Sequence, residues 1–363
     1  MSIKENQYTP SVYFHPGETL VEKLEEMGMS SKEFAVRTGK PEKTISAVLN
    51  GKSAITPDMA IQFEKVTKIP AHFWMNSQRG YDEYIAREKH KRTIEEAIEW
   101  FKCFPVAEMV KKGWIQAQKT THEKVSELLS FFGISNHLAW ENLFLNQQLK
   151  VAFRISLAHT QEPHAISAWL RRGELQATKL VVPVYSEKVF KDVLPEIKKI
   201  MMGQPDDFFI QLQSICLDAG VMVVYTPCIK KAPINGCTRW IGDSPLIQLS
   251  GRYKRNDGFW FTFFHEAGHI ILHGKKDVFL EIDNFKKDEE KEKEADNFAV
   301  KWTLSEEEER EITQCSVITE KDIVRFAKKF NTHPAVIIGC LQHKGMIHYS
   351  IGRDYIKPVS FES

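Results

Sequence analysis

The sequence has almost no net charge, although more than a quarter of its residues are charged. The chain contains 49 lysine and arginine residues against 48 aspartate and glutamate residues, which excludes a protein that binds nucleic acid through overall basicity. Any contact with nucleic acid must therefore come from a local cluster of positive side chains. With 42% hydrophobic and 27% charged residues, the composition also excludes a disordered or collagenous chain.

Long apolar segments and paired cysteines are also missing. No apolar run approaches the ~20 residues that span a membrane, and residues 1–10 are polar and lack the pattern of a secretory signal. The 6 cysteines are scattered, without a CxxC pair, as expected for reduced thiols. We therefore expect a cytoplasmic protein without a membrane partner.

The order of the periodic segments predicts an α+β protein of several parts. Apolar residues recur at helical spacing up to about residue 140, whereas short β-branched runs separated by helices follow Lys179. The 363 residues are enough for two or three domains. The predicted parts are an all-helical helix-turn-helix domain over 1–75, a helical middle scaffold over 76–178, a domain with a small sheet over 179–310 and a C-terminal helical extension over 311–363.

Strands are predicted in the third of these parts, before a strongly apolar helix. The runs that predict them are Leu180–Val184, Val221–Tyr225, Cys237–Ile241 and Pro245–Leu249. The helix that follows extends from about Phe259 to Leu272.

Four or five short helices separated by turn residues are predicted between Gly17 and Thr67. In a helix-turn-helix unit, the second helix lies in the major groove of DNA and the side chains of its first turn reach the base edges. We expect that helix at Pro41–Asn50, after a turn at Gly39. Five basic and two acidic residues lie between positions 30 and 53, so a local positive cluster exists. The candidate DNA-contacting residues are Lys40, Glu42, Lys43, Thr44, Ser46 and Lys52.

A helical bundle with a lysine-rich solvated face is the alternative explanation for this cluster. Three segments resemble the Cro and phage-repressor (XRE) helix-turn-helix family, namely Met29–Gly39, Lys40–Ser46 and Asn50–Lys52. Three more are similar to the HigA-type antitoxin branch, namely His15–Glu18, Ile55–Pro57 and Ile69–Trp74. The resemblance covers about the first quarter of the chain and implies a regulator that binds operator DNA, with a toxin as a further partner. We expect a homodimer, because such repressors read two half-sites.

An HExxH motif at His265-Glu266-Ala-Gly-His269 lies in the predicted apolar helix. Residues four apart lie one turn above each other on a helix, so both imidazoles can face one metal ion while Glu266 acts as general base on a water. A catalytic zinc needs a third protein ligand. Glu292 in the later ExxAD pattern is the candidate, and Asp296, one turn further, can bond a ligand imidazole and fix its tautomer.

Other residues near these motifs leave alternatives open. Glu294 points about 200° away from Glu292 on a helix and is expected to be a solvated charge. His273 is either a metal ligand or a structural residue beside the site, and its spacing favours the second role. Cys228 and Cys237 are either buried core residues or thiolates that take the open zinc position. The spacing does not select the oxyanion-stabilising residue among Arg239, Tyr253, Arg255, His343 and His348.

HExxH followed by ExxAD is the gluzincin arrangement, and its context resembles the ImmA/IrrE family of metallopeptidases. The ExEAD-x-FA pattern begins at Glu292. The segments that look like the version of this domain fused behind HigA-type regulators are Ala232–Gly236, Cys237–Trp240, Ile247–Ser250 and Phe259–Thr262. The resemblance implies a zincin-like fold with Zn²⁺. The implied roles are metal ligands at His265, His269 and Glu292, and the general base at Glu266.

Together these patterns predict a DNA-binding transcriptional regulator that carries a zinc-dependent metallopeptidase. Its expected substrate is a protein, either a repressor or the chain itself. The first alternative is a HigA-like antitoxin and repressor that binds a toxin while its zinc site is catalytically silent. The second alternative is a metal-sensing repressor whose operator affinity depends on zinc occupancy.

Overall fold

The structure of the chain, a computed structural model, describes residues 13–145, 162–252, 255–276, 279–282, 289–315 and 318–361. By its internal contacts the chain divides into two compact units, Met1–Glu96 and Ala97–Ser363. The finer division at residues 75, 178 and 310 stays a prediction.

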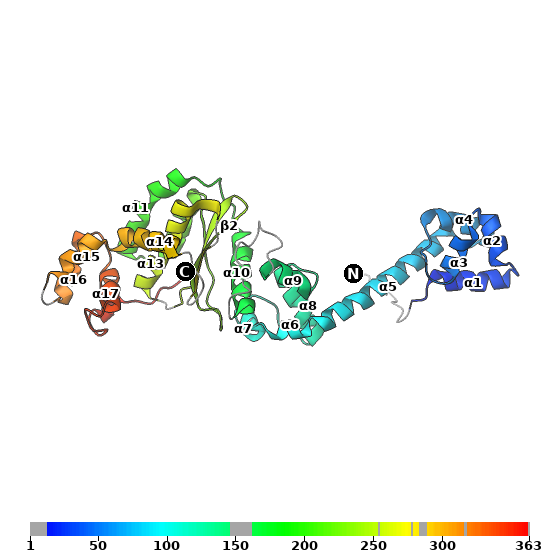
Figure 1. Ribbon diagram of the computed structural model, residues 1–363, viewed down its shortest axis with the longest axis horizontal. Helices are drawn as coiled ribbons and strands as arrows, with labels where there is room; N and C mark the ends of the chain where they lie inside the picture. The colour runs from blue at the N-terminus through cyan, green and yellow to red at the C-terminus, as the bar shows by residue number, and fades with distance from the viewer. Residues whose placement is uncertain are drawn as a thin grey trace, which may run out of the picture. The chain divides into compact units, whose positions relative to one another are not determined.

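Within its described residues the N-terminal unit contains five α-helices (Figure 1). They are α1 (Pro16–Glu26), α2 (Ser31–Thr38), α3 (Glu42–Leu49), α4 (Pro57–Thr67) and α5 (Ala71–Glu96). Apolar side chains that recur at helical spacing meet in one core, which includes Leu20, Phe34, Ile45 and Phe63. The turn after α2 passes through Gly39, whose φ of 66° favours glycine. This turn joins α2 to α3 as the predicted helix-turn-helix.

The predicted recognition helix is α3, and its ends differ slightly from the prediction. Pro41 holds the N-cap position rather than the first helical turn, and no side chain caps the helix there. At the other end, the side-chain amide of Asn50 donates to the carbonyl oxygen of Ser46 at 2.7 Å. Helix α3 is therefore one residue shorter at each end than Pro41–Asn50.

The C-terminal unit begins with helices that pack through aromatic rings. They are α6 (Ile98–Lys102), α7 (Val106–Lys111), α8 (Thr121–Phe132), α9 (His137–Phe144) and α10 (Pro163–Ala177). The ring of Trp140 stacks on that of His164 with centroids 4.4 Å apart, and Phe104 meets both rings edge-on. The indole N–H of Trp140 also donates to the hydroxyl of Ser167. These contacts hold α9 against α10.

Among the described residues, four strands form one sheet in the order β1-β3-β2-β4. They are β1 (Met222–Tyr225), β2 (Ile234–Ile241), β3 (Ser244–Leu249) and β4 (Phe279–Ile282). β1 runs parallel to β3, whereas β2 is antiparallel to both β3 and β4. Successive side chains point to opposite faces, so Val223 and Ile247 join the main core while Met222 and Leu246 pack against Ala177 of α10.

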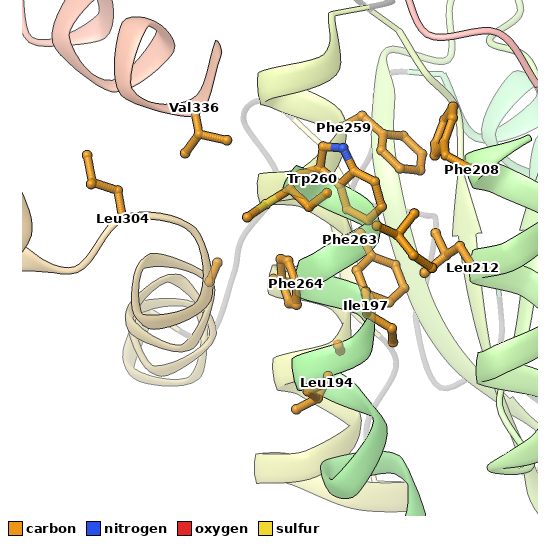
Figure 2. Packing of buried hydrophobic residues seen from close by; sticks show 14 of the residues in the cluster. Leu194, Ile197, Phe208, Leu212, Phe259, Trp260, Phe263, Phe264, Leu304 and Val336 are labelled. Atoms are coloured by element: carbon orange, nitrogen blue, oxygen red, sulfur yellow. The ribbon is translucent and has the colours of Figure 1, made fainter. Parts of the chain in front are cut away.

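Helices cover the opposite face of the sheet from α10. The remaining elements of this unit are α11 (Glu187–Gly203), α12 (Phe208–Asp218), α13 (Asn256–His273), η2 (Gly274–Lys276), α14 (Glu289–Thr303), α15 (Glu306–Thr313), α16 (Glu320–Lys329), α17 (Pro334–His343) and η3 (Arg353–Tyr355). Figure 2 shows Phe259 and Phe263 of α13 packed against Phe208 and Leu212 of α12, with Ile197 of α11 beside them. This burial fixes α13 in the core, and α13 carries the HExxH motif.

The predicted α+β class is confirmed, with one strand wrongly predicted. Strands expected at 221–225, 237–241 and 245–249 correspond to β1, β2 and β3, while β4 was not predicted. Leu180–Val184 has no regular structure, and the side chains of Val181 and Val184 are 92% and 91% exposed. Pro183 removes one possible donor from this segment, and neither valine side chain is buried, so the segment lacks the packing that stabilises a strand.

None of the helices in the described ranges is both long and apolar enough to cross a membrane.

Candidate functional site

One face of α13 carries the two histidines and the glutamate of the HExxH motif. His265, Glu266 and His269 are all buried. Their rings and carboxylate are held by an apolar helix whose aromatic residues fill the core on the other side. The Nε2 atoms of His265 and His269 lie 3.0 Å apart, because residues four apart share one helix face.

The third ligand candidate comes from α14, which packs directly beside α13. Gly268 permits this approach, since a Cβ there would lie 3.1 Å from Cβ of Phe298 and 3.3 Å from Cα of Ala295. The carboxylate oxygens of Glu292 lie 3.7 Å from Nε2 of His265 and 3.5 Å from Nε2 of His269. One donor atom from each of these three residues therefore falls within 4.8 Å of the others.

Asp296 fixes the tautomer of the His265 imidazole. Its Oδ1 lies 2.8 Å from Nδ1 of His265, and an ionised carboxylate only accepts hydrogen bonds. The neutral ring of His265 therefore carries its hydrogen on Nδ1 and presents the lone pair of Nε2 toward His269 and Glu292. This is the carboxylate–histidine contact that the ExxAD spacing predicts.

The donor set fits a zinc ion. Two imidazole nitrogens and one carboxylate are the ligands of many catalytic zinc sites, which keep a further position open. Nitrogens at about 2.0–2.1 Å from a tetrahedral zinc lie roughly 3.3 Å apart, close to the 3.0 Å between the two Nε2 atoms. Two nitrogen lone pairs that face each other at this distance repel, and the carboxylate beside them adds negative charge. A bound cation would stabilise this arrangement.

His273 and Glu294 form a second contact between α13 and α14. Nδ1 of His273 lies 3.0 Å from Nδ1 of His269, on the side of that ring away from Glu292, and Nε2 of His273 lies 2.9 Å from Oε2 of Glu294. This geometry places His273 behind a ligand candidate rather than among the ligands. As expected, Glu294 is an exposed charge, with 56% of its side chain accessible, and its carboxylate also bonds His273.

Thr238 of β2 holds the predicted general base. Its hydroxyl lies 2.6 Å from Oε2 of Glu266. A Cβ at Gly236, two residues earlier, would lie 2.4 Å from Oε1 of Glu266 and 2.8 Å from Cγ2 of Thr262, so only glycine leaves room for the carboxylate. Sequence reasoning missed both residues as parts of the site, because no spacing along the chain connects β2 to α13.

The predicted oxyanion candidates fall into different surroundings. Arg239 is buried and bonds the carbonyl oxygen of Leu170, which gives it a structural role, and His348 bonds Ser350 at the surface. Tyr253 lies outside the described residues. Arg255 and His343 line a cavity of about 440 Å³ that also touches Thr262, one turn before Glu266 on α13.

Of the two cysteines near the site, one is a buried core residue and the other is half-buried. Cys237 is fully buried on β2, and burial raises the pKa of its thiol well above the usual range. Cys228 is half-buried, and its thiol donates to the carbonyl oxygen of Ile234 at 3.4 Å. Burial raises the pKa of Cys228 as well.

The predicted DNA-contacting residues lie around α3 in the N-terminal unit. Glu42, Lys43 and Ser46 are exposed on the helix, Thr44 is half-buried, and Lys52 is exposed just after it. Lys40 differs from these, because its ammonium group pairs with the carboxylate of Asp58 at 2.5 Å.

Two protein families match separate parts of the chain. Residues 20–74 match the Helix-turn-helix family. Residues 216–337, which include α13 and α14, match the Peptidase M78 family, described as the IrrE N-terminal-like domain. The fold and these matches define a helix-turn-helix regulator that carries a second domain of a peptidase family.

Individual relatives match a short part of the chain. Virulence-associated protein A of Dichelobacter nodosus is 39% identical over 69 residues, which are 18% of this chain and 68% of that protein. The uncharacterised HTH-type transcriptional regulator YddM of Escherichia coli (strain K12) is 36% identical over 66 residues, 18% of this chain and 70% of that one. A solved structure of an addiction module antidote protein of the HigA family from Coxiella burnetii is 36% identical, with 23% of this chain and 91% of that chain covered and a TM-score of 0.22. The chain belongs to the XRE-type helix-turn-helix family and contains an ImmA/IrrE-type Peptidase M78 domain.

Proposed function

We propose that this regulator binds operator DNA through its N-terminal unit and hydrolyses a peptide bond of a protein through its C-terminal unit. The observation that carries the proposal is the arrangement on α13 and α14. Three donor atoms from His265, His269 and Glu292 converge, while Glu266 lies beside them with its carboxylate held from β2. A structural metal site would have no need of a separate, oriented carboxylate.

His265, His269 and Glu292 would hold a zinc ion. When bound, zinc supplies Lewis acidity to the scissile carbonyl and to the attacking water. Residues of the chain would transfer the proton and orient a ligand. Glu266 takes a proton from the water as its oxygen attacks the carbonyl carbon, and later gives that proton to the leaving amine nitrogen as the peptide bond breaks. Asp296 keeps the imidazole of His265 in the tautomer that presents Nε2.

The DNA-binding half of the proposal rests on α3. The exposed residues Lys43 and Ser46 and the half-buried Thr44 would reach base edges, and Lys52 would contact a phosphate. Lys40 would contribute less than predicted, because Asp58 neutralises it. A homodimer in the cytoplasm would place two copies of α3 on the two half-sites of an operator.

The substrate would be a protein that shares the operator, either a repressor or a second copy of the chain. Tethering the peptidase to a DNA-binding unit raises its effective concentration near such a partner, to about millimolar for short flexible linkers. Cleavage would then relieve repression. Constitutive cleavage would destroy the regulator, so the proposal includes a latent peptidase that a signal activates.

The test compares wild type with Glu266→Gln, which should keep zinc and lose hydrolysis because Glu266 is not a ligand. Each protein is incubated with the product of the neighbouring gene, with and without zinc, and the mixture is measured by intact-mass analysis. In parallel, a reporter driven by the native promoter is followed under DNA damage and phage infection. Cleavage and derepression by wild type alone support the proposal.

Equal derepression by wild type and Glu266→Gln would show that the switch does not need hydrolysis. That result would favour a HigA-like antitoxin that binds a toxin, with a silent zinc site. Operator affinity that changes with zinc occupancy, without cleavage, would favour a metal-sensing repressor.

A further inference from the structure

A second histidine–carboxylate pair lies behind the proposed metal site and is not used by the mechanism above. His273 ends α13, one turn after His269, and its side chain is only 4% exposed. It lies between Nδ1 of His269 at 3.0 Å and Oε2 of Glu294 at 2.9 Å. The imidazole of His273 therefore connects the carboxylate of Glu294 to the ring of His269 through two hydrogen bonds.

The carboxylate of Glu294 determines which nitrogen atoms of His273 and His269 carry a hydrogen. An ionised carboxylate only accepts, so Nε2 of His273 carries the hydrogen and donates it to Glu294. A neutral imidazole has one N–H, and Nδ1 of His273 must therefore accept from the Nδ1–H of His269. The lone pair of His269 is then left on Nε2, which lies 3.0 Å from Nε2 of His265 and 3.5 Å from Glu292.

We propose that His273 and Glu294 are positioning residues that together fix the tautomer and ring orientation of His269 for metal binding. This inference rests on the proposed metal site. Asp296 acts directly on His265, whereas Glu294 acts on His269 through an intervening imidazole. α14 thereby orients both ligand histidines of α13 and also supplies Glu292.

The first test measures metal affinity rather than activity. Zinc-free full-length protein is titrated with Zn²⁺ in competition with a chromophoric chelator, and with Co²⁺ while its visible d–d bands are recorded. Partners that orient a ligand histidine are worth about 10- to 100-fold in metal affinity. We therefore expect His273→Leu, which can neither accept nor donate, to weaken zinc binding by about that factor and to change the Co²⁺ spectrum.

His273→Gln is the conservative variant. Its amide oxygen can accept from His269 and its amide N–H can donate to Glu294, so it should restore most of the affinity that His273→Leu loses. Glu290→Gln is the matched control, because it removes an exposed carboxylate from α14 one turn before Glu294. It should bind zinc as wild type does. Thermal unfolding of each zinc-free variant checks that its fold is retained.

A double variant separates the proposed relay from simple charge attraction. If Glu294 acts only through His273, adding Glu294→Gln to His273→Leu should weaken zinc binding no further. Independent effects that multiply would overturn the proposal. So would wild-type affinity in His273→Leu, or equal losses in His273→Leu and His273→Gln. A wild-type chain that binds neither metal would instead overturn the proposed metal site, and this inference with it.

Discussion

The hydroxyl of Thr238 on β2 lies 2.6 Å from Oε2 of Glu266 on α13, and 3.0 Å from the carbonyl oxygen of the same residue. A residue of the sheet thus holds the side chain of Glu266, which belongs to helix α13. A carboxylate that takes a proton from water must keep one orientation while the attack proceeds. Within the described part of the chain, the Thr238 hydroxyl bonds Glu266 and none of the proposed metal ligands.

We expect Thr238→Val to bind zinc normally and to cleave substrate roughly tenfold more slowly. The change keeps the shape of the side chain and removes one hydrogen bond to a charged group, worth about 1.5 kcal/mol or slightly more. Initial rates from intact-mass analysis measure the loss. Thr238→Ser, which keeps a hydroxyl, should remain near wild type. Wild-type rates in Thr238→Val would show that Glu266 needs no such restraint.

Metal content tests the ligand assignment. Glu292→Ala removes one of three proposed protein ligands and should leave the desalted protein with little zinc. Asp296→Ala should still bind zinc, but about 10- to 100-fold more weakly, because only the orientation of His265 is lost. Elemental analysis and chelator competition measure the two effects. If Glu292→Ala kept full zinc while His273→Ala lost it, the assignment would be wrong.

The residues that converge on the proposed metal could be predicted because short-range helix geometry brings them together. His265 and His269 are four apart on one helix, and Glu292 and Asp296 repeat that spacing on another. Each pair shares a face whatever the rest of the fold does. Neither spacing predicts that α14 packs against α13. That expectation came from the resemblance of the two motifs to the gluzincin arrangement.

The roles of Thr238 and Glu294 in orienting the site could not be predicted, because their contacts depend on tertiary packing. Thr238 reaches Glu266 only because β2 lies beside α13. Glu294 points away from Glu292 on its own helix, yet its carboxylate meets His273 of the neighbouring helix α13. At Leu180–Val184, β-branched composition predicted a strand, but Val181 and Val184 are exposed and the segment has no regular structure.

The N-terminal unit yields a prediction about operator binding. Lys43→Ala combined with Thr44→Ala should reduce discrimination between operator and random DNA, because both side chains lie on the first turn of α3. Lys52→Ala should weaken binding to every sequence similarly and lower the slope of log affinity against log salt by roughly one. Fluorescence anisotropy over a salt series measures both.

Lys65 on α4 provides a control for these DNA variants. It is an exposed lysine outside the predicted recognition helix, so Lys65→Ala should leave operator discrimination unchanged. An unchanged footprint for the Lys43 and Thr44 double variant would exclude α3 as the reading helix.

The N-cap of α17 predicts a pH dependence of stability. Nδ1 of His333 accepts from the backbone N–H of Ala335 at 3.1 Å. Burial, together with the nearby charge of Lys357, lowers the pKa of His333 to about 4. In the unfolded chain this histidine titrates near 6.5. Its contribution to stability is therefore complete above about pH 6.5, and it is lost as the pH falls from there toward 4, because the unfolded state binds the proton more readily.

The expected loss is roughly 1 to 2 kcal/mol, since partial exposure of His333 reduces the full effect of the shift. Asparagine also caps helices well and does not titrate in this range. We therefore expect His333→Asn to match wild type near pH 7 within about 1 kcal/mol and to lose less stability on acidification. Urea unfolding of the two zinc-free proteins at pH 7.5 and pH 5 gives the comparison, and other titrating groups cancel in the difference between them. Parallel losses in both proteins would mean that His333 does not carry this part of the pH dependence.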